Sequence, residues 1–165
     1  MILPDLFRRL LLRWAEWYGS RPPDAVIQSR YLERWYITPW SAAYRDIPAE
    51  EHTRWQRFVH ALPNVYLHLF TGSDYARALH DHPWDSMSVI LMGGYVEHTP
   101  AGEHWRPAGS VVWRRAEDLH RIEVTPAMPL VVTLFITGRR RRLWGFDCPE
   151  GWREYREWDR NGGCE

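Results

Sequence analysis

The sequence predicts an all-β fold, either a sandwich or a barrel, and three observations support this prediction. Between residues 64 and 147 the 165-residue chain consists of short runs rich in aromatic and β-branched residues. Turns that contain Gly or Pro separate these runs at close, regular spacing. The same stretch lacks the apolar periodicity of helices, which excludes alternating strand–helix units. We therefore expect a rolled antiparallel sheet as the core of the molecule.

The chain divides into three expected parts, of which residues 1–30 form the first. Its segment 4–18 is predicted to be an amphipathic helix, with arginines opposite the apolar face. The apolar positions at helical spacing are Leu6, Leu10, Trp14 and Trp17. We prefer a helix packed on the β-domain or on a second subunit, and a helix that lies on a membrane surface is the alternative.

Residues 31–147 are the expected β-domain, and residues 148–165 are a C-terminal tail that forms a helix or wraps the domain. The first strand is expected at 31–37, followed by a short helix over 48–61, because Pro48 is favoured in the first helical turn. The further strands are expected at 65–70, 86–92, 95–99, 110–114, 119–124, 130–137 and 141–147.

Two histidines, His80 and His82, lie between the second and third of these strands. Alternate side chains of an extended segment share a face, so both imidazoles can point to one metal ion while Asp81 points away. A third histidine, His120, lies far along the chain in another strand-like context. The three imidazoles predict a site for a divalent metal ion, although this ligand type alone does not distinguish Fe, Zn, Ni, Cu and Mn.

The spacing of the histidines resembles the two sequence motifs of the cupin superfamily. The first motif reads roughly G-x5-H-x-H-x(3,4)-E-x6-G, and His80, His82 and Gly93 fall in register with it. Gly109 and His120 fall in register with the second motif, G-x5-P-x-G-x2-H-x3-N. The resemblance covers the expected β-domain. It implies a single-domain cupin-like β-barrel, or jelly roll, with a divalent metal ion, for which iron is the first expectation and zinc, nickel and manganese are alternatives.

The chain departs from the first motif at its acidic position, where Ser86 stands in place of glutamate. Asp85, one residue away, and Glu97 are the candidate carboxylates, and either could act as a further ligand or as an acid/base group. For Glu97, a carboxylate on the surface or behind a ligand is the competing interpretation. Four residues with polar or aromatic side chains are candidates for substrate binding: His68, Tyr66, Trp84 and Arg106. Core packing is the competing interpretation for the aromatic residues and for His68.

The resemblance implies a mononuclear metalloenzyme, with a dioxygenase-like oxidoreductase that acts on a small polar substrate as the first expectation. One fold hosts many chemistries, so two alternatives stay open. One is a metal-dependent isomerase or lyase. The other is a non-catalytic protein that binds or senses a ligand.

Composition narrows the range of partners. The formal net charge is zero, and the run Arg139–Arg142 is expected to be a solvated turn, so we expect no direct binding to nucleic acid.

All 21 residues counted as Lys or Arg are arginine, which excludes Schiff-base chemistry on lysine. No apolar run approaches the roughly 20 residues of a membrane span, so we expect no membrane partner.

The cysteines and the aromatic segments give two further expectations. Cys148 and Cys164 are the only cysteines, and a disulfide between them would close a short tail loop of small consequence. We therefore expect a reducing, cytoplasmic location. A homodimer that forms through the first strand and the N-terminal helix is the expected assembly.

Overall fold

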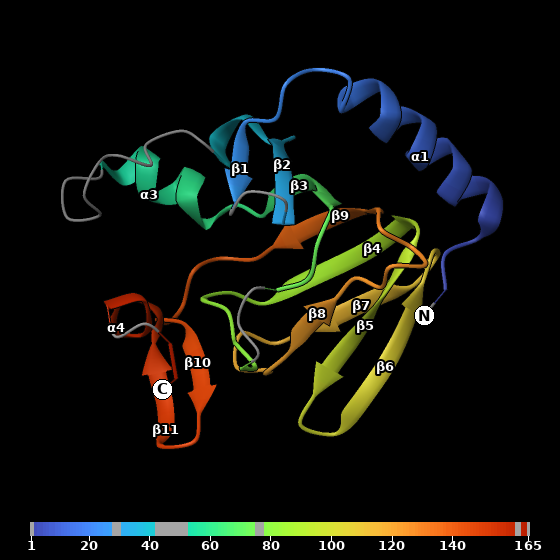
Figure 1. Ribbon diagram of the computed structural model, residues 1–165. Coiled ribbons are helices and arrows are strands. Elements are labelled where there is room, and N and C mark those ends of the chain that lie inside the picture. The colour runs from blue at the N-terminus through green and yellow to red at the C-terminus, as the bar shows by residue number, and fades with distance from the viewer. Residues whose placement is uncertain (1, 28–30, 42–52, 75–77, 161–162, 165) are drawn as a thin grey trace.

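Two antiparallel sheets face each other in the computed structural model, and a long helix covers the outer face of the larger one (Figure 1). The structure describes residues 2–27, 31–41, 53–74, 78–160 and 163–164. The larger sheet consists of β1 (Ala25–Ile27), β2 (Leu32–Tyr36), β3 (Asn64–Phe70), β9 (Val131–Thr137), β4 (Ser86–Met92) and β7 (Val111–Arg114), in this spatial order. The smaller sheet consists of β6 (Gly102–Pro107), β5 (Gly94–Thr99) and β8 (Arg121–Glu123). The predicted all-β architecture is thus confirmed.

The core lies between the two sheets and draws buried side chains from both. Leu32, Phe70, Ile90 and Val131 come from the larger sheet, and Tyr95 and Ile122 come from the smaller one. The other face of the larger sheet packs against the N-terminal helix. Burial on both faces explains why β4 reads as an almost continuous apolar run instead of an alternating one.

Helix α1 (Asp5–Tyr18) forms where the sequence predicts it, but only Trp14 of its four predicted apolar positions packs against the sheet. Leu6, Leu10 and Trp17 are exposed, whereas Ala15 is buried against the sheet. Arg8, expected on the solvent face, donates a hydrogen bond to the backbone oxygen of Leu91 over 2.8 Å. The helix carries two apolar stripes, and the one with the small Ala15 side chain allows the closer approach to the sheet. No helix in the described part of the chain is long and apolar enough to cross a membrane.

Several element boundaries differ from the predicted ones. Helix α3 (Arg54–Ala61) begins after Thr53, whose side chain and that of Gln56 form a reciprocal capping box. The expected start of this helix at Pro48 lies outside the described residues. Strand β1 lies within residues 1–30, where no strand was expected, and a short 3₁₀ turn, η1 (Pro39–Ser41), follows β2.

The C-terminal part folds into a hairpin and a short helix. Strand β10 (Gly145–Cys148) begins later than the strand predicted over 141–147, and it pairs with β11 (Gly151–Glu154). Helix α4 (Tyr155–Arg160) follows, so the tail contains both a strand and a helix.

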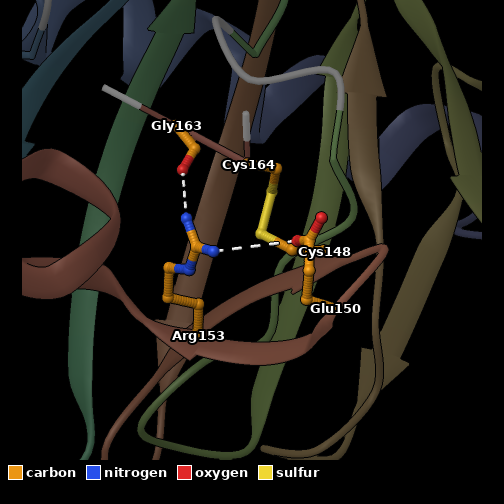
Figure 2. Close-up of a disulfide and its surroundings, with 5 residues drawn as sticks. All are labelled: Cys148, Glu150, Arg153, Gly163 and Cys164. Carbon is orange, nitrogen blue, oxygen red and sulfur yellow. Dashed lines mark hydrogen bonds and ion pairs between the residues drawn. A yellow bond between two sulfur atoms is a disulfide. The ribbon is translucent and has the colours of Figure 1, made fainter. Parts of the chain in front are cut away.

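A disulfide joins Cys148 to Cys164 and closes this tail onto β10 (Figure 2). Within the closed loop, the Arg153 guanidinium donates to the backbone oxygen of Gly163 over 2.7 Å and lies 3.7 Å from the Glu150 carboxylate. The two cysteines are 16 residues apart, and closing a loop of this size contributes about 3 kcal/mol in the chain-entropy model. The disulfide therefore matters more than the sequence analysis expected, and it does not match the expected reducing compartment.

Candidate metal centre

The HxH segment is extended, but it joins its neighbours through isolated bridges instead of a regular strand. His80 exchanges both backbone hydrogen bonds with His120, each at 2.9 Å. On the opposite edge, the N–H of Asp81 donates to the oxygen of Gly145 over 3.1 Å. Residues directly opposite each other in an antiparallel pair share a face, so the pairing brings the His80 and His120 rings together, and His82 joins them two residues on.

The three imidazoles converge on one point. The ring centroids of His80 and His120 are 4.9 Å apart, and each ring lies 5.1 Å from the ring of His82. One ligand atom from each residue lies within 4.8 Å of the other two, and this is the one such group of three or more among the described residues. The Nε2 atoms of His82 and His120 are 2.8 Å apart. Imidazole nitrogens that converge in this way could hold a divalent ion, to which each bond would be about 2.1 Å long.

Burial keeps the rings of His82 and His120 in the form that binds metal. It lowers the pKa of His82 well below its usual value and the pKa of His120 to about 4. Positive charge on the neighbouring histidines and on Arg114 acts in the same direction. Both imidazoles are therefore neutral at pH 7 and can offer a nitrogen lone pair to a cation.

Glu97 lies behind His120, on the side of the ring away from His82. Its Oε1 is 3.4 Å from Nδ1 of His120, and the carboxylate accepts hydrogen bonds from Arg106 over 2.7 Å and from Arg114 over 2.5 Å. Burial would raise the pKa of Glu97, but His120, Arg114 and Arg106 together hold it well below its usual range. A carboxylate in this position orients a metal-binding imidazole without itself binding the metal.

Arg114 is the buried centre of the network that holds Glu97. Only 4% of its surface is exposed, and it also donates to Ser88 Oγ over 3.0 Å and to Tyr95 Oη over 3.1 Å. Sequence analysis missed this role. The available signal was the position of Arg114 in a predicted strand, two residues from Val112 and thus on the same face.

Asp74 occupies the equivalent place behind His80. Its Oδ2 lies 3.9 Å from His80 Nδ1 and accepts a hydrogen bond from the N–H of Ile122 over 2.6 Å. The hydroxyl of Tyr31 donates to the other carboxylate oxygen. Asp74 lies in the loop before the HxH segment. The sequence around it did not predict its contact with His80, because the fold of the loop brings the two side chains together.

A small cavity of about 70 Å³ adjoins the histidines inside the barrel. Its polar lining includes Tyr31, Arg34, His68, Asp74, Ser88, Tyr95 and Thr133, and its apolar lining includes Phe70 and Phe135. His68 thus faces the cavity, where its Nε2 accepts a hydrogen bond from Arg34 over 2.8 Å. Burial lowers the pKa of His68 well below its usual value. A space of this size suits a few water molecules or a small ligand.

The other predicted site residues lie around this cavity without lining it. Tyr66 stacks on His68 with 5.9 Å between ring centroids, and Trp84 stacks on His82 at 6.4 Å. Asp85 is engaged elsewhere, since it accepts hydrogen bonds from the N–H of Ala116 over 2.9 Å and from Arg141 over 2.6 Å.

Arg106 lines a separate groove of about 420 Å³ on the far side of Glu97 and His120. The structure therefore does not bring Asp85 or Arg106 to the histidine cavity. Arg139, Arg140 and Arg141 are exposed, as expected for a solvated turn, although Arg141 also pairs with Asp85 and the partly buried Arg142 pairs with Asp81.

Comparisons with known proteins give only distant likenesses. No protein-family model and no curated protein matches the chain. The chain is similar to a cupin superfamily protein from Desulfitobacterium hafniense, with 12% identity over 70% of this chain and 84% of that chain, at a TM-score of 0.46. It is also similar to KdgF from a Halomonas species, with 11% identity over 70% of this chain and 87% of that one, at 0.48.

The chain is also similar to a structure described among those of the DMSP lyases RdDddP and RnDddQII. The two chains share 17% identity over 46% of this chain, at a TM-score of 0.40. This chain spans 38% of the length of that protein. Independently of these partial similarities, the two facing antiparallel sheets and the meeting of the HxH segment with the distant histidine agree with the motif resemblance. The chain therefore has the predicted cupin-like fold.

Proposed function

We propose that the chain is a mononuclear metalloenzyme that acts on a small polar substrate, with His80, His82 and His120 as the metal ligands. The observation that carries this proposal is the convergence of three buried or half-buried imidazoles from distant segments beside a small cavity. A divalent ion bound there would supply a Lewis acid with open coordination positions.

The hydrogen bonding of His120 supports the fit of a cation. Its buried Nδ1 has no hydrogen-bond partner, although the Glu97 carboxylate lies 3.4 Å away. When Nε2 of an imidazole binds a cation, the ring proton must sit on Nδ1, and here it would face an ionised carboxylate. Nε2 of His120 already faces His82, 2.8 Å away, so this tautomer would leave its lone pair on the side where a cation would bind.

Within this class, an iron-dependent, dioxygenase-like oxidoreductase is our first candidate. An isomerase or lyase needs a side chain that exchanges protons with the substrate. Glu97 is clamped by two arginines, and Asp85 is paired with Arg141, so neither expected carboxylate is placed for this task. Oxidation at a metal depends less on such a group.

A metal-dependent lyase or isomerase is the second candidate, and one observation favours it. Tyr31 lines the cavity and donates a hydrogen bond to Asp74. Burial raises the pKa of Tyr31 well above its usual value, and Asp74 adds to this effect. The hydroxyl therefore stays protonated at neutral pH, and with Asp74 to accept its proton it could exchange protons with a bound substrate. A non-catalytic ligand-binding protein would use the same cavity without either reaction.

Metal loading followed by oxygen-uptake measurements tests the proposal. The purified protein is loaded anaerobically with Fe(II), its metal content is determined, and a panel of small polar compounds is screened for substrate-dependent oxygen uptake. We expect about one ion per chain in the unaltered protein, much less in His82→Ala, and no loss in His98→Ala, whose ring pairs with Glu123 outside the centre. Less than about 0.1 ion per chain after loading would overturn the proposal.

The assembly that we propose is a homodimer. The exposed side chains of Leu6, Leu10 and Trp17 on α1 form an apolar surface that a second copy could cover. Sedimentation velocity measures this directly, and a monomer at micromolar concentration would contradict it.

A further inference from the structure

The face of the HxH segment that points away from the metal ligands carries Asp81, which is 2% exposed. Its carboxylate accepts hydrogen bonds from three donors of the C-terminal part of the chain. The N–H of Gly145 donates over 2.8 Å, the indole of Trp152 donates over 2.9 Å, and the Arg142 guanidinium donates to the same oxygen as the indole. The Asp81 side chain, which lies between two proposed ligands in the sequence, therefore accepts hydrogen bonds from the start of β10, from β11 and from the loop before β10.

The hairpin that Asp81 contacts is itself closed by the tail. The ring of Trp158 on α4 stacks on Phe146 of β10, with 4.3 Å between centroids, and Trp144 stacks on Tyr155 at 4.7 Å. The Cys148–Cys164 disulfide then ties the end of the chain to β10 (Figure 2). The hairpin therefore has a packed and covalently closed support of its own, beside the two main sheets (Figure 1).

His80 is the point at which this hairpin meets the smaller sheet. Its backbone bridges His120 on one edge and Phe146 on the other. Its ring also lies 5.8 Å from the ring of Phe146 and 6.3 Å from that of Trp144. A shift of the hairpin would therefore move the backbone and the ring surroundings of one metal ligand directly.

We propose that Asp81 is a positioning residue for the metal centre, through which the disulfide-closed C-terminal hairpin fixes His80 and His82. This inference rests on the proposed metal function. A buried carboxylate with three donors allows its backbone little freedom, and the ligands on either side share that backbone. Outer groups that hold metal ligands in place typically change metal affinity by about 10–100-fold when they are removed.

Metal affinity in Asp81→Asn is the first test. We expect the amide to lose the charged contact with Arg142 and to weaken Co(II) binding about tenfold or more, with a changed visible absorption spectrum of the bound Co(II). Affinity is measured by chelator competition at a temperature where circular dichroism shows each variant fully folded. Asp147→Asn is the matched control, because the same chemical change occurs on an exposed position of the same hairpin and should leave affinity and spectrum unaltered.

Trp152→Phe keeps the inference testable if Asp81→Asn does not fold. It removes a single donor to Asp81 while an aromatic ring remains, and we expect a several-fold loss of Co(II) affinity. A role confined to stability would lower the melting temperature of these variants and leave affinity and spectrum equal to those of the unaltered protein, which would overturn the inference. Failure of the unaltered protein to bind Co(II) would instead refute the metal centre itself.

Discussion

The two faces of the HxH segment differ in how completely their polar groups are paired. On one face, Asp81 accepts three hydrogen bonds and is fully engaged with the C-terminal hairpin. On the other face, the buried indole N–H of Trp84 has no hydrogen-bond partner, and the buried Nδ1 of His120 reaches only the Glu97 carboxylate, 3.4 Å away. Unpaired buried polar groups are costly, and native folds retain few of them. The contrast supports our proposal that one face stabilises the segment and the other binds a ligand.

Replacement of His120 should give the largest effect on the ligand face. His120→Ala removes a proposed metal ligand and the ring that faces Glu97, and we expect Zn(II) affinity to fall at least about 1000-fold, because two ligands would remain where tight sites use three or four. Isothermal titration calorimetry measures this loss. His104→Ala, on β6, is the control for a histidine outside the centre. Unchanged affinity in His120→Ala would show that the ligand set is wrong.

Glu97→Ala tests whether the support behind His120 also stabilises the fold. Without Glu97, the guanidinium of Arg114 stays buried without its carboxylate, and we expect the free energy of unfolding to fall by about 3–5 kcal/mol. Urea denaturation measures the change. Glu123→Ala, which removes a half-exposed carboxylate paired with His98 on the same sheet, should cost less than about 1 kcal/mol. Equal losses in the two variants would contradict the buried network.

Reduction of the disulfide tests the support of the other face. The loop closed by Cys148 and Cys164 should contribute about 3 kcal/mol, so a dithiol reductant should lower the urea midpoint. The double variant Cys148→Ser/Cys164→Ser should show the lower midpoint with and without reductant. A midpoint that does not respond to reductant in the unaltered protein would mean that the disulfide is absent or without effect on stability.

Lowering the pH should destabilise the fold of the metal-free protein, because it protonates the buried His120. The folded pKa of His120 is about 4 and its unfolded value about 6.5, so the unfolded chain binds more protons between these values. The stability that the protein gains from keeping His120 neutral is complete above pH 6.5 and is lost as the pH falls toward 4. One such histidine gives about 2 kcal/mol between pH 7 and pH 5, measured by urea denaturation. His120→Ala should show a shallower decline, and an identical decline would assign the effect to other groups.

Substitutions on the exposed stripe of α1 should have the smallest effect. Leu10→Ser changes an exposed side chain, and we expect a change within about 0.5 kcal/mol in the unfolding of the protomer. Leu12→Ser on the inner stripe removes packing against the sheet and should cost more than 1 kcal/mol, by analogy with other losses of half-buried apolar groups. If Leu10→Ser also lowers the sedimentation coefficient, the outer stripe forms the proposed dimer contact.

The local sequence pattern was sufficient to predict the positions of most strands of the two main sheets. Strand β4 coincides with the predicted run 86–92, and β3, β5, β7 and β9 differ from their predicted bounds by one residue at the start. These strands have apolar runs and clear turn residues at their ends, which act within a few residues of chain. Prediction was poorer for β10 and β8, where only parts of the expected strands pair regularly. There the backbone partners are isolated bridges to the HxH segment, and pairing of this kind has no local signal.

The sequence by itself determined the type of fold and the candidate ligands, because alternation, turn residues and histidine spacing are properties of neighbouring residues. Only the tertiary structure decided which stripe of α1 is buried, which carboxylates lie behind His80 and His120, and which donors form hydrogen bonds with Asp81. These outcomes depend on contacts between distant segments, such as the hydrogen bond between Asp81 and Trp152 across 71 positions. A buried charge takes its role from the partners that the folded chain brings to it, and the order of residues along the chain does not specify those partners.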